Sequence, residues 1–330
     1  MYLLVVLAIF TFILAFVILK IYLKLTIGKC YCNVYLNGKV ALITGGNSGL
    51  GFHLALALAG RGCRVIIADK DDCEKTKENI IAQTGNSNIV TKKFNLASLR
   101  SVRELVKDIT DSEDRLDFLI NNAGIGGTGK SYTEDGLDLG MQVNFFGHFL
   151  LTHLLIGLLK KSSPSKIIFL SSKLAFFHNL SLDNLNYPQD QVGVVSAYLK
   201  IYANSKLCSI IAARELSKKL TGTEVTVYAV HPGVVYTQIY LRNGKVPSLT
   251  NTIYKLFNTI MTKPLSRSPE EGIQTALHVI LCKQIVKDTG KLFAECKVHR
   301  PPAKAEDSDF AKKIWNASEN YVRLNPNEII

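Results

Sequence analysis

The stretch Thr44-Gly45-Gly46-Asn47-Ser48-Gly49-Leu50-Gly51 directly follows the apolar run 40–44 and opens a segment with helical periodicity. Glycines in such a turn allow a tight bend and the close approach of a ligand to the backbone. The free N–H groups and the positive dipole of a helix N-terminus attract a pyrophosphate. A strand, a glycine-rich turn and a helix in this order therefore predict a nucleotide site, which we expect to comprise Gly45, Asn47, Ser48, Gly49, Leu50 and Gly51.

From about Lys39 onward, short β-branched runs alternate with longer helical patterns, which is typical of a parallel sheet covered on both faces. We expect strands at 40–44, 64–69, 89–94, 118–121, 166–171, 224–230 and 291–293. We expect helices at 50–59, 98–112, 136–161, 198–220 and 269–281. The pattern predicts a doubly wound α/β fold with a parallel, seven-stranded Rossmann sheet in a single domain, residues 39–330.

Two stretches, near 173–197 and 236–267, do not belong to the alternation. They follow the fifth and sixth expected strands, and ligands bind beyond the carboxyl ends of the strands in open α/β sheets. We therefore expect both stretches to act as lids that shape a substrate site.

The composition excludes several classes of protein. Hydrophobic residues make up 47% of the 330 residues and charged residues 20%, which rules out a disordered or low-complexity chain. The net charge of +12 would suit nucleic acid or an anionic membrane surface. No zinc-finger spacing and no aromatic RNA-binding motif is present, so we expect no nucleic-acid partner and no metal.

The N-terminus is predicted to anchor the protein in a membrane. Residues 2–19 carry no charge, and with residues 21–23 they reach about 33 Å as a helix. No basic residue precedes this run, unlike in a cleaved signal peptide, so residues 1–25 are expected to remain as an anchor followed by a linker, 26–38. The first lysines after the run, Lys20, Lys24, Lys29 and Lys39, predict a single-pass protein of the endoplasmic reticulum with its catalytic domain in the cytosol. A lipid-droplet location is the alternative.

The seven cysteines are odd in number and scattered, which indicates reduced thiols rather than a disulfide framework. Only Cys30 and Cys32 are clustered. Cysteines so close to a membrane segment can be acylated, although two unmodified thiols are the favoured interpretation.

Two motifs carry a family resemblance. The glycine spacing is Gly-x-x-x-Gly-x-Gly, and Asn121-Asn122-Ala123-Gly124 follows the fourth expected strand. Together they resemble the short-chain dehydrogenase/reductase family. The resemblance extends over nearly the whole chain after residue 36 and is closest to the retinol dehydrogenase 11-to-14 type branch, on the stretches 143–155, 231–235, 268–272 and 293–296. It implies a nicotinamide cofactor that contacts Asn122, Ala123, Gly124, Pro232 and Gly233.

The cofactor type is predicted from the end of the second strand. Asp69 lies there, where a carboxylate can accept hydrogen bonds from the adenosine ribose hydroxyls. A 2′-phosphate would meet like charge, although Lys70 can partly offset it, so NAD(H) is favoured and NADP(H) is the alternative. The family usually has an aspartate near the adenine after the third strand, where this chain has Asn95, followed by Leu96.

The sequence also offers an acid for hydride-transfer chemistry. Reducing a carbonyl needs a group that protonates the developing alkoxide, and the reverse reaction needs the matching base. A tyrosine serves both purposes beside a lysine, whose ammonium at ~4 Å contributes on the order of 4 kcal/mol at an effective dielectric of ~20. Tyr202-x-x-x-Lys206 lies in an expected helix, where positions i and i+4 share a face. Tyr35-x-x-x-Lys39 has the same spacing but precedes the first strand, so we interpret it as coincidence.

The resemblance implies the roles of the remaining residues. Ser172, rather than Ser171, would hydrogen-bond the substrate carbonyl. Asn144 would hold a water that links Lys206 to solvent, and Lys206 and Tyr202 would also contact the cofactor. His148 and His231 are expected to be structural.

The same resemblance implies a lipophilic alcohol or aldehyde as substrate, such as a retinoid, with other isoprenoids or sterols as alternatives. Apolar residues in both expected lids agree with this substrate class, and the membrane lipid would be a further partner. A homodimer through the long helices is expected from family relatives. The competing hypothesis is a non-catalytic nucleotide-binding scaffold of the same fold.

Overall fold

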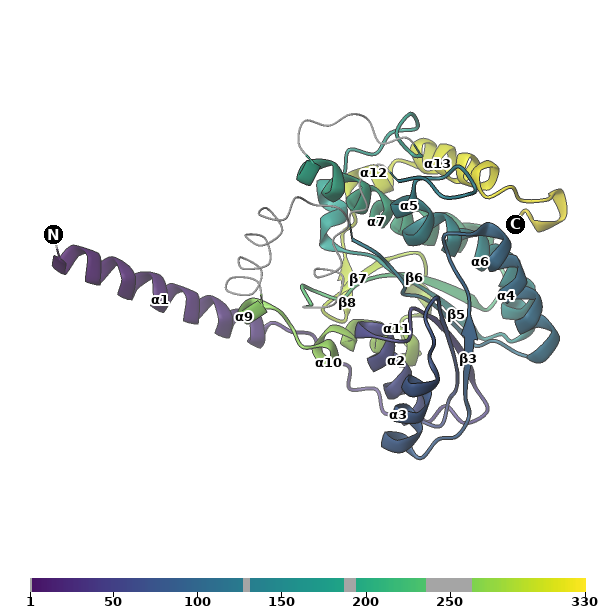
Figure 1. Ribbon diagram of the computed structural model, residues 1–330, viewed down its shortest axis with the longest axis horizontal. Coiled ribbons are helices and arrows are strands. Elements are labelled where there is room, and N and C mark those ends of the chain that lie inside the picture. The colour runs from purple at the N-terminus through teal and green to yellow at the C-terminus, as the bar shows by residue number, and fades with distance from the viewer. Residues whose placement is uncertain (1, 127–130, 187–193, 236–262) are drawn as a thin grey trace.

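The computed structural model describes residues 2–126, 131–186, 194–235 and 263–330. Its centre is a sheet with the strand order β3-β2-β1-β4-β5-β6-β7-β8 (Figure 1). Strands β1 to β7 pair in parallel, and β8 pairs antiparallel with β7. The strands are β1 Val40–Thr44, β2 Arg64–Asp69, β3 Ile89–Lys93, β4 Phe118–Asn121, β5 Ser165–Leu170, β6 Val225–His231, β7 Leu292–Ala294 and β8 Lys297–His299.

The expectation of seven strands is wrong by one. Strand β8 has three residues, all exposed, so its sequence lacks the apolar pattern that marks a buried strand. It forms because Glu295 and Cys296 adopt left-handed φ angles of 52° and 57°, which turn the chain back along β7. The seven expected strands are all present, with ends that differ by at most one or two residues.

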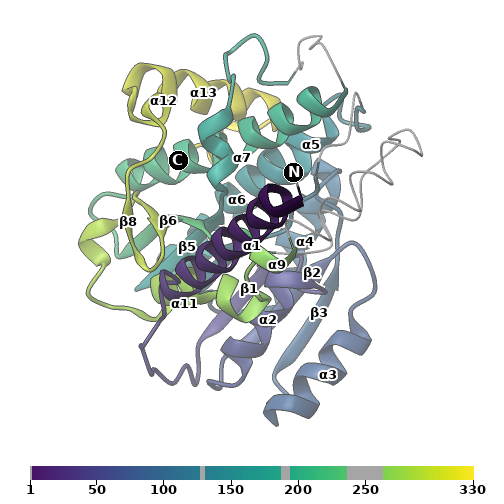
Figure 2. The same cartoon turned by 90° about the vertical axis from the view of Figure 1, so that its left-hand side faces the viewer.

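Helices cover both faces of the sheet (Figures 1 and 2). One face carries α4 Leu99–Ser112, α6 Gly147–Lys161, α7 Val194–Lys219 and α13 Ser308–Tyr321. The other carries α2 Gly49–Ala59, α3 Glu74–Thr84, α10 Pro269–Gly272 and α11 Gln274–Leu281. The apolar strand residues are buried on both sides, as expected for a doubly wound sheet.

Amphipathic periodicity explains how the helices pack. In α4, the side chains that face the sheet recur every three or four residues, from Leu99 through Val102 and Leu105 to Ile109. The Ser98 hydroxyl accepts the Ser101 N–H and caps this helix. The capping box from Ser268 to Glu271 likewise begins α10.

Four of the α-helices among the described residues were not expected from the sequence: α3, α9 Lys263–Leu265, α12 Ala303–Glu306 and α13. Two expected helices are interrupted. Residues 269–281 form α10 and α11 with Ile273 between them, and residues 136–161 form α5 Leu139–Met141, a π-helical turn η1 Gln142–Phe146, and then α6. A π turn inserts one extra residue per turn and is not encoded in the apolar period.

The first expected lid is partly described. A 3-10 helix η2, Lys173–Phe177, follows β5 and leads into an irregular segment. The rest of this lid, 187–193, and most of the second lid, 236–262, lie outside the described residues. Their action as lids therefore stays a prediction.

The N-terminal helix α1, Tyr2–Leu25, projects away from the body of the protein (Figures 1 and 2). Many of its described apolar side chains are exposed, Phe10 and Tyr22 among them. The stretch Leu139–Lys161 meets the length and hydropathy test for a membrane span. That region is 72% buried inside the domain, which identifies it as a core helix.

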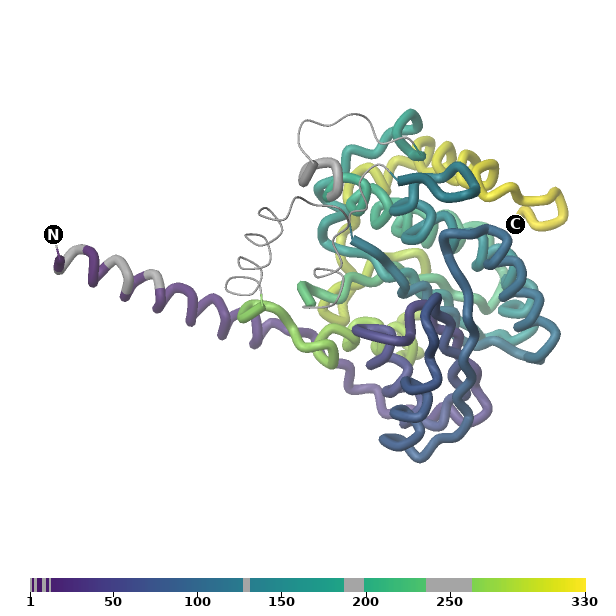
Figure 3. The backbone as a smooth tube through the Cα atoms, in the orientation of Figure 1, coloured from purple at the N-terminus to yellow at the C-terminus, as the bar shows by residue number. Residues whose placement is uncertain are grey.

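Residues 26–38 connect α1 to β1 and run along the body of the domain (Figure 3). Leu36 is buried, and its N–H donates to the Arg61 carbonyl. Cys30, Cys32 and Val34 pack against the core on the α11 side of the sheet. The expected linker is thus seated on the domain along much of its length.

Candidate active site

A cavity of about 740 Å³ opens at the carboxyl ends of the parallel strands. Its wall combines the glycine-rich turn, the ends of β2, β4, β5 and β6, and one side of α7. Most of the site residues expected from the sequence line it: Gly45, Asn47, Ser48, Gly49, Leu50, Asp69, Lys70, Asn95, Leu96, Asn122, Ala123, Gly124, Ser172, Tyr202, Lys206, Pro232 and Gly233. Gly51 and Asn144 do not form part of its wall.

The glycine-rich turn packs too closely to accept side chains. Gly45 has a left-handed φ of 67°, and a Cβ there would lie 2.8 Å from the Cα of Ala123. A Cβ on Gly51 would overlap the Gly45 carbonyl oxygen. Gly51 therefore supports the turn from behind rather than contacting a ligand.

The N-terminus of α2 faces the same cavity. The Ser48 side chain makes no capping hydrogen bond to the first turn of α2, so the N–H groups of that turn are available to a ligand. A diphosphate fits this cradle, because the unpaired N–H groups and the helix dipole both favour negative charge.

A buried network joins the turn to the end of β4. Thr44 Oγ1 accepts the N–H groups of Asn122 and Ala123 at 2.9 and 3.0 Å. Oγ1 of Thr44 also lies within hydrogen-bond distance of Nε2 of His148, at 2.8 Å, and of the Ile120 carbonyl, at 3.4 Å. Burial, with a smaller contribution from Lys206, lowers the pKa of His148 to about 3. The His148 ring is therefore neutral and belongs to this buried network.

The end of β2 presents a carboxylate beside the turn. Asp69 accepts the Asn47 N–H at 3.3 Å through Oδ2 and the Asp71 N–H at 3.3 Å through Oδ1. Lys70 forms an ion pair with Asp71 at 3.1 Å. Asp71 also lines the cavity and was not expected from the sequence. Lys70 and Asp71 therefore form an ion pair at the surface, and Lys70 does not pair with Asp69.

The proposed acid and its lysine lie in one wall of the cavity. Tyr202 and Lys206 are on α7, and Nζ of Lys206 is 5.5 Å from the centre of the Tyr202 ring. Lys206 is buried, and its Nζ donates to the Leu170 carbonyl at 2.9 Å. Burial lowers the pKa of Lys206 to about 8. Because Lys206 has few contacts with solvent, its positive charge acts mainly on the protein groups around it.

The two serines at the end of β5 have different environments. The Ser171 hydroxyl donates to the Lys206 carbonyl at 2.8 Å, which ties β5 to α7. Ser172 Oγ accepts the Leu174 N–H at 3.2 Å, so its own proton can be donated elsewhere. Both serines border the cavity. The Ser171 proton is used in the hydrogen bond to α7, whereas the Ser172 proton is not.

Asn144 is buried within the π-helical turn, behind the cavity wall. Its side chain pairs twice with the backbone of Ile125, accepting the N–H at 2.8 Å and donating to the carbonyl at 3.0 Å. It also donates to the Ser205 hydroxyl at 3.3 Å. Ile125 lines the cavity, so Asn144 fixes a piece of its wall and reaches α7 one residue before Lys206.

Three further residues from the sequence analysis, His231, Tyr35 and Lys39, make structural contacts or lie at the surface. His231 Nδ1 accepts the Lys173 N–H at 3.1 Å, and burial and the nearby Arg267 lower its pKa to about 4. Tyr35 is 78% exposed on the segment before β1, and Lys39 pairs with Asp117 at 2.8 Å. Neither Tyr35 nor Lys39 borders the cavity.

Several wall residues were not anticipated: Asp71, Phe94, Ala97, Ile125, Gly126, Leu139, Val143, Leu170, Ser171 and Val235. Most lie within a few residues of an expected site residue. Adjacency to the motifs is the signal that could have found them.

Comparisons with known proteins identify the family. Residues 39–183 match the family model described as short chain dehydrogenase. Retinol dehydrogenase 11 of Mus musculus is 37% identical over 320 residues, covering 95% of each chain, and retinol dehydrogenase 13 of Homo sapiens is 36% identical over 314 residues, covering 94% of this chain and 92% of its own. The solved structure of Pseudomonas aeruginosa RhlG in an active-site complex with NADP has a TM-score of 0.58 and 24% identity, with 78% of this chain and 95% of that chain covered. The chain is an oxidoreductase of the nicotinamide-dependent short-chain dehydrogenase/reductase family, related to the retinol dehydrogenases.

Proposed function

We propose that the protein is a membrane-anchored oxidoreductase that interconverts lipophilic alcohols and aldehydes of the retinol and retinal type. The observation that carries the chemistry is the Tyr202 and Lys206 pair in the cavity wall, with Ser172 on the neighbouring strand end. A bound nicotinamide supplies or accepts the hydride. The chain must then supply the proton and hold the reacting carbonyl.

Tyr202 is the proposed acid and base. Its hydroxyl gives a proton to the carbonyl oxygen during reduction and takes it back during oxidation. The buried ammonium of Lys206, 5.5 Å from the Tyr202 ring centre, stabilises the phenolate left by proton donation. Ser172 orients the carbonyl through its free proton, and Lys206 also binds the nicotinamide ribose.

Asn144 is the proposed positioning residue of the set. Its side chain hydrogen-bonds the backbone of Ile125 and the hydroxyl of Ser205, the residue before Lys206, and this placement supports a role in a water path from the lysine to solvent. This role rests on the backbone conformation of the π turn, which turns the Asn144 side chain toward Ile125.

NAD(H) is the proposed cofactor, although RhlG was solved with NADP. Asp69 and Asp71 both border the cavity, and Lys70 pairs with Asp71 rather than with Asp69. A like charge at about 6 Å and an effective dielectric of about 40 costs about 1.4 kcal/mol, which is a tenfold preference against a 2′-phosphate.

The proposed substrate class is supported by the relatives' names and by the described part of the first lid. Phe177 is 64% exposed, and Phe176 and Leu182 are each 41% exposed, so this segment presents apolar surface. Leu180 is instead buried and belongs to the core. Other isoprenoid and sterol aldehydes are the alternatives to retinal.

The proposed location is the endoplasmic reticulum membrane, with the catalytic domain in the cytosol and lipid droplets as the alternative. The length and apolar composition of α1 support this, as do the lysines that follow its apolar run. A homodimer also stays a prediction.

The test follows nicotinamide absorbance while detergent-solubilised protein reduces retinal, with NADH and NADPH at equal concentrations. We expect turnover with both and faster turnover with NADH. Tyr202→Phe should keep cofactor binding and lose turnover by at least 100-fold, within the range of general acid catalysis. Tyr35→Phe is the matched control, because Tyr35 belongs to the other Tyr-x-x-x-Lys sequence and should leave turnover unchanged. Full activity of Tyr202→Phe would refute the assignment of the acid.

If neither cofactor is consumed with retinal, the next substrates are isoprenoid and sterol aldehydes. Turnover of one of these would replace the retinoid in the proposal and keep the mechanism. The absence of turnover with retinal and with all of these aldehydes would refute the proposed substrate class.

A further inference from the structure

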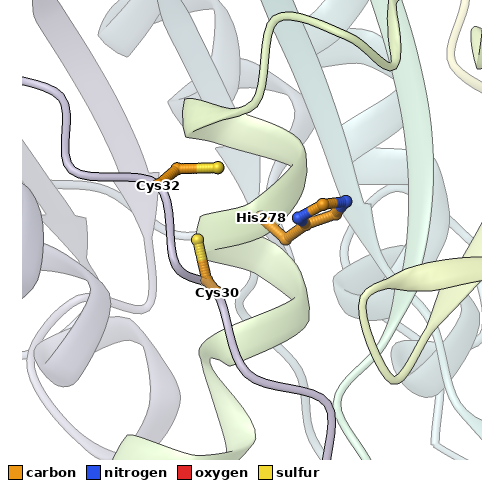
Figure 4. Close-up of side chains that lie close together, drawn as sticks. All are labelled: Cys30, Cys32 and His278. Carbon is orange, nitrogen blue, oxygen red and sulfur yellow. The ribbon is translucent and has the colours of Figure 1, made fainter.

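Three metal-ligating side chains meet on the face of the domain that carries α11. Cys30 and Cys32 lie on the extended segment before β1, and His278 lies on α11 (Figure 4). The two Sγ atoms and a ring nitrogen of His278 are all within 4.8 Å of one another. In the part of the chain that the structure describes, this is the one group of three such side chains so close together.

A fourth ligand is next to this group. Cys282 lies one turn after His278 at the end of α11 and is buried, and its thiol is close enough to that of Cys32 to raise the pKa of Cys32. The Cys282 thiol donates to Oε1 of Gln284 at 2.9 Å. Positions i and i+4 of a helix share a face, and positions i and i+2 of an extended segment lie on the same side. A Cys-x-Cys segment and a His-x-x-x-Cys helix can therefore direct four ligands to one point.

We propose that Cys30, Cys32, His278 and Cys282 bind a structural zinc ion. Three thiolates and one imidazole are an established ligand set for structural zinc, with four-coordinate tetrahedral geometry. Zinc bonds of about 2.3 Å to sulfur and about 2.0 Å to nitrogen place neighbouring ligand atoms about 3.5 to 3.8 Å apart. The ligand atoms of Cys30, Cys32 and His278 are at most 4.8 Å apart, so closing their separations to those values requires shifts of about 1 Å.

The surroundings suit a closed and negatively charged centre. Zn²⁺ with three thiolates carries one net negative charge. The ammonium of Lys166 donates to the carbonyls of Val279 and Cys282 at 2.8 and 2.7 Å, so a cation lies at the edge of the site. None of the four ligands lines the active-site cavity, and a structural site has no need of an open position.

The zinc would fasten the N-terminal segment to the catalytic domain. Other contacts already bring the two together: the Gly28 N–H donates to the Glu295 carboxylate at 2.9 Å, and the Cys30 N–H donates to Oε1 of Gln274 at 3.0 Å. Lys24, in the last turn of α1, pairs with Glu271 of α10 at 2.6 Å. Segments that lie 244 residues apart in sequence are joined here. A zinc ion bound at this point would fix the position at which α1 leaves the domain.

No zinc motif can be recognised in the sequence, because the two ligand pairs lie at opposite ends of the chain. Zinc motifs are recognised by the spacing between nearby ligands. Here the second pair arrives only when α11 packs beside the segment that precedes β1.

The first test measures metal in the full chain, purified in detergent under anaerobic and reducing conditions after expression with added zinc. We expect about one zinc per chain by elemental mass spectrometry. Metal-free protein titrated with Co²⁺ should develop the visible absorption of a tetrahedral thiolate site. The double variant Cys30→Ser/Cys32→Ser and the variant His278→Asn should each bind zinc at least tenfold more weakly.

The fourth ligand is tested with a matched pair of variants. Cys296 also lies close to Cys30, so it is a thiol of the same neighbourhood. Cys282→Ser should weaken zinc binding at least tenfold, whereas Cys296→Ser should not change it. The reverse result would overturn the assignment of Cys282.

A second measurement needs no variant and so does not depend on the folding of one. Bound zinc should protect Cys30 and Cys32 of the unmodified chain from alkylation by a maleimide, and a zinc chelator should remove the protection. Substoichiometric zinc in all preparations, a disulfide among these thiols, or a thioester on Cys30 or Cys32 would each overturn the proposal. Activity does not enter any of these readouts, so they stand apart from the test of the proposed reaction.

Discussion

Lys206→Met is expected to abolish turnover and to stabilise the folded enzyme at neutral pH. Burial lowers the pKa of Lys206 to about 8, against about 10.4 for an ordinary lysine. At about 1.4 kcal/mol for each pKa unit, the buried ammonium costs about 3 kcal/mol of stability at pH 7. Lys206→Met avoids this cost. It also leaves the Leu170 carbonyl without its donor, which lowers the stability by about 1 to 2 kcal/mol. A net gain of about 1 to 2 kcal/mol remains.

The pH dependence gives the prediction its sign. The folded protein releases the Lys206 proton near pH 8, whereas the unfolded chain keeps it to about pH 10.4. Between these values the unfolded state binds more protons, so wild-type stability rises with pH. By pH 10 most of the cost has gone, and the advantage of Lys206→Met should vanish or reverse.

The assay is urea unfolding of the cofactor-free enzyme in detergent at pH 7 and pH 10, together with turnover at pH 7. Lys200→Met is the control, because Lys200 is on the same helix and donates to the Phe177 carbonyl at an exposed position. We expect Lys200→Met to change stability little at either pH and to keep turnover. A Lys206→Met protein that is less stable than wild type at pH 7, or equally active, would refute the reasoning.

Three further predictions concern two residues of the cofactor site and one buried carboxyl group. Asp69→Asn should improve the ratio of NADPH to NADH efficiency about tenfold, and an unchanged ratio would remove Asp69 as the cofactor selector. Gly51→Ala places a methyl group on the Gly45 carbonyl and should weaken NADH binding at least tenfold in a fluorescence titration, whereas Gly157→Ala, which meets open space on α6, should bind normally. Burial raises the pKa of Asp138 to about 6. Between about pH 4 and 6 the folded state therefore binds more protons than the unfolded state. The free energy of unfolding falls by about 3 kcal/mol as the pH rises through that window. Asp138→Asn should remove this dependence and raise the urea midpoint at pH 8, and equal midpoints for both proteins would contradict it.

Local patterns were enough for most of the sheet. The seven expected strands are all present because each is a short apolar run bounded by turn residues. Strand β8 escaped because its residues are exposed and it depends on the left-handed turn at Glu295 and Cys296. Helix α13 has the amphipathic period and a cap at Asp307, so the sequence does contain a signal for it.

The site was predictable where its residues belong to continuous motifs. Gly45 and its neighbours in the turn line the cavity as expected, and so do Tyr202 and Lys206 one helical turn apart. The placement of Asn144 was not predictable, because it depends on a π turn that interrupts the apolar period. The pairing of Lys70 with Asp71 was equally hidden, since it depends on side-chain conformations.

The sequence by itself determined the class of fold, the nucleotide-binding turn and the helical pairing of Tyr202 with Lys206. These features are set by neighbours within a few residues, for which backbone periodicity and helix geometry suffice. Only the tertiary structure decided how deeply Lys206 is buried, and that Cys30 and Cys32 meet His278. Burial and long-range contact depend on which distant segments pack together, and no local period in the chain encodes that.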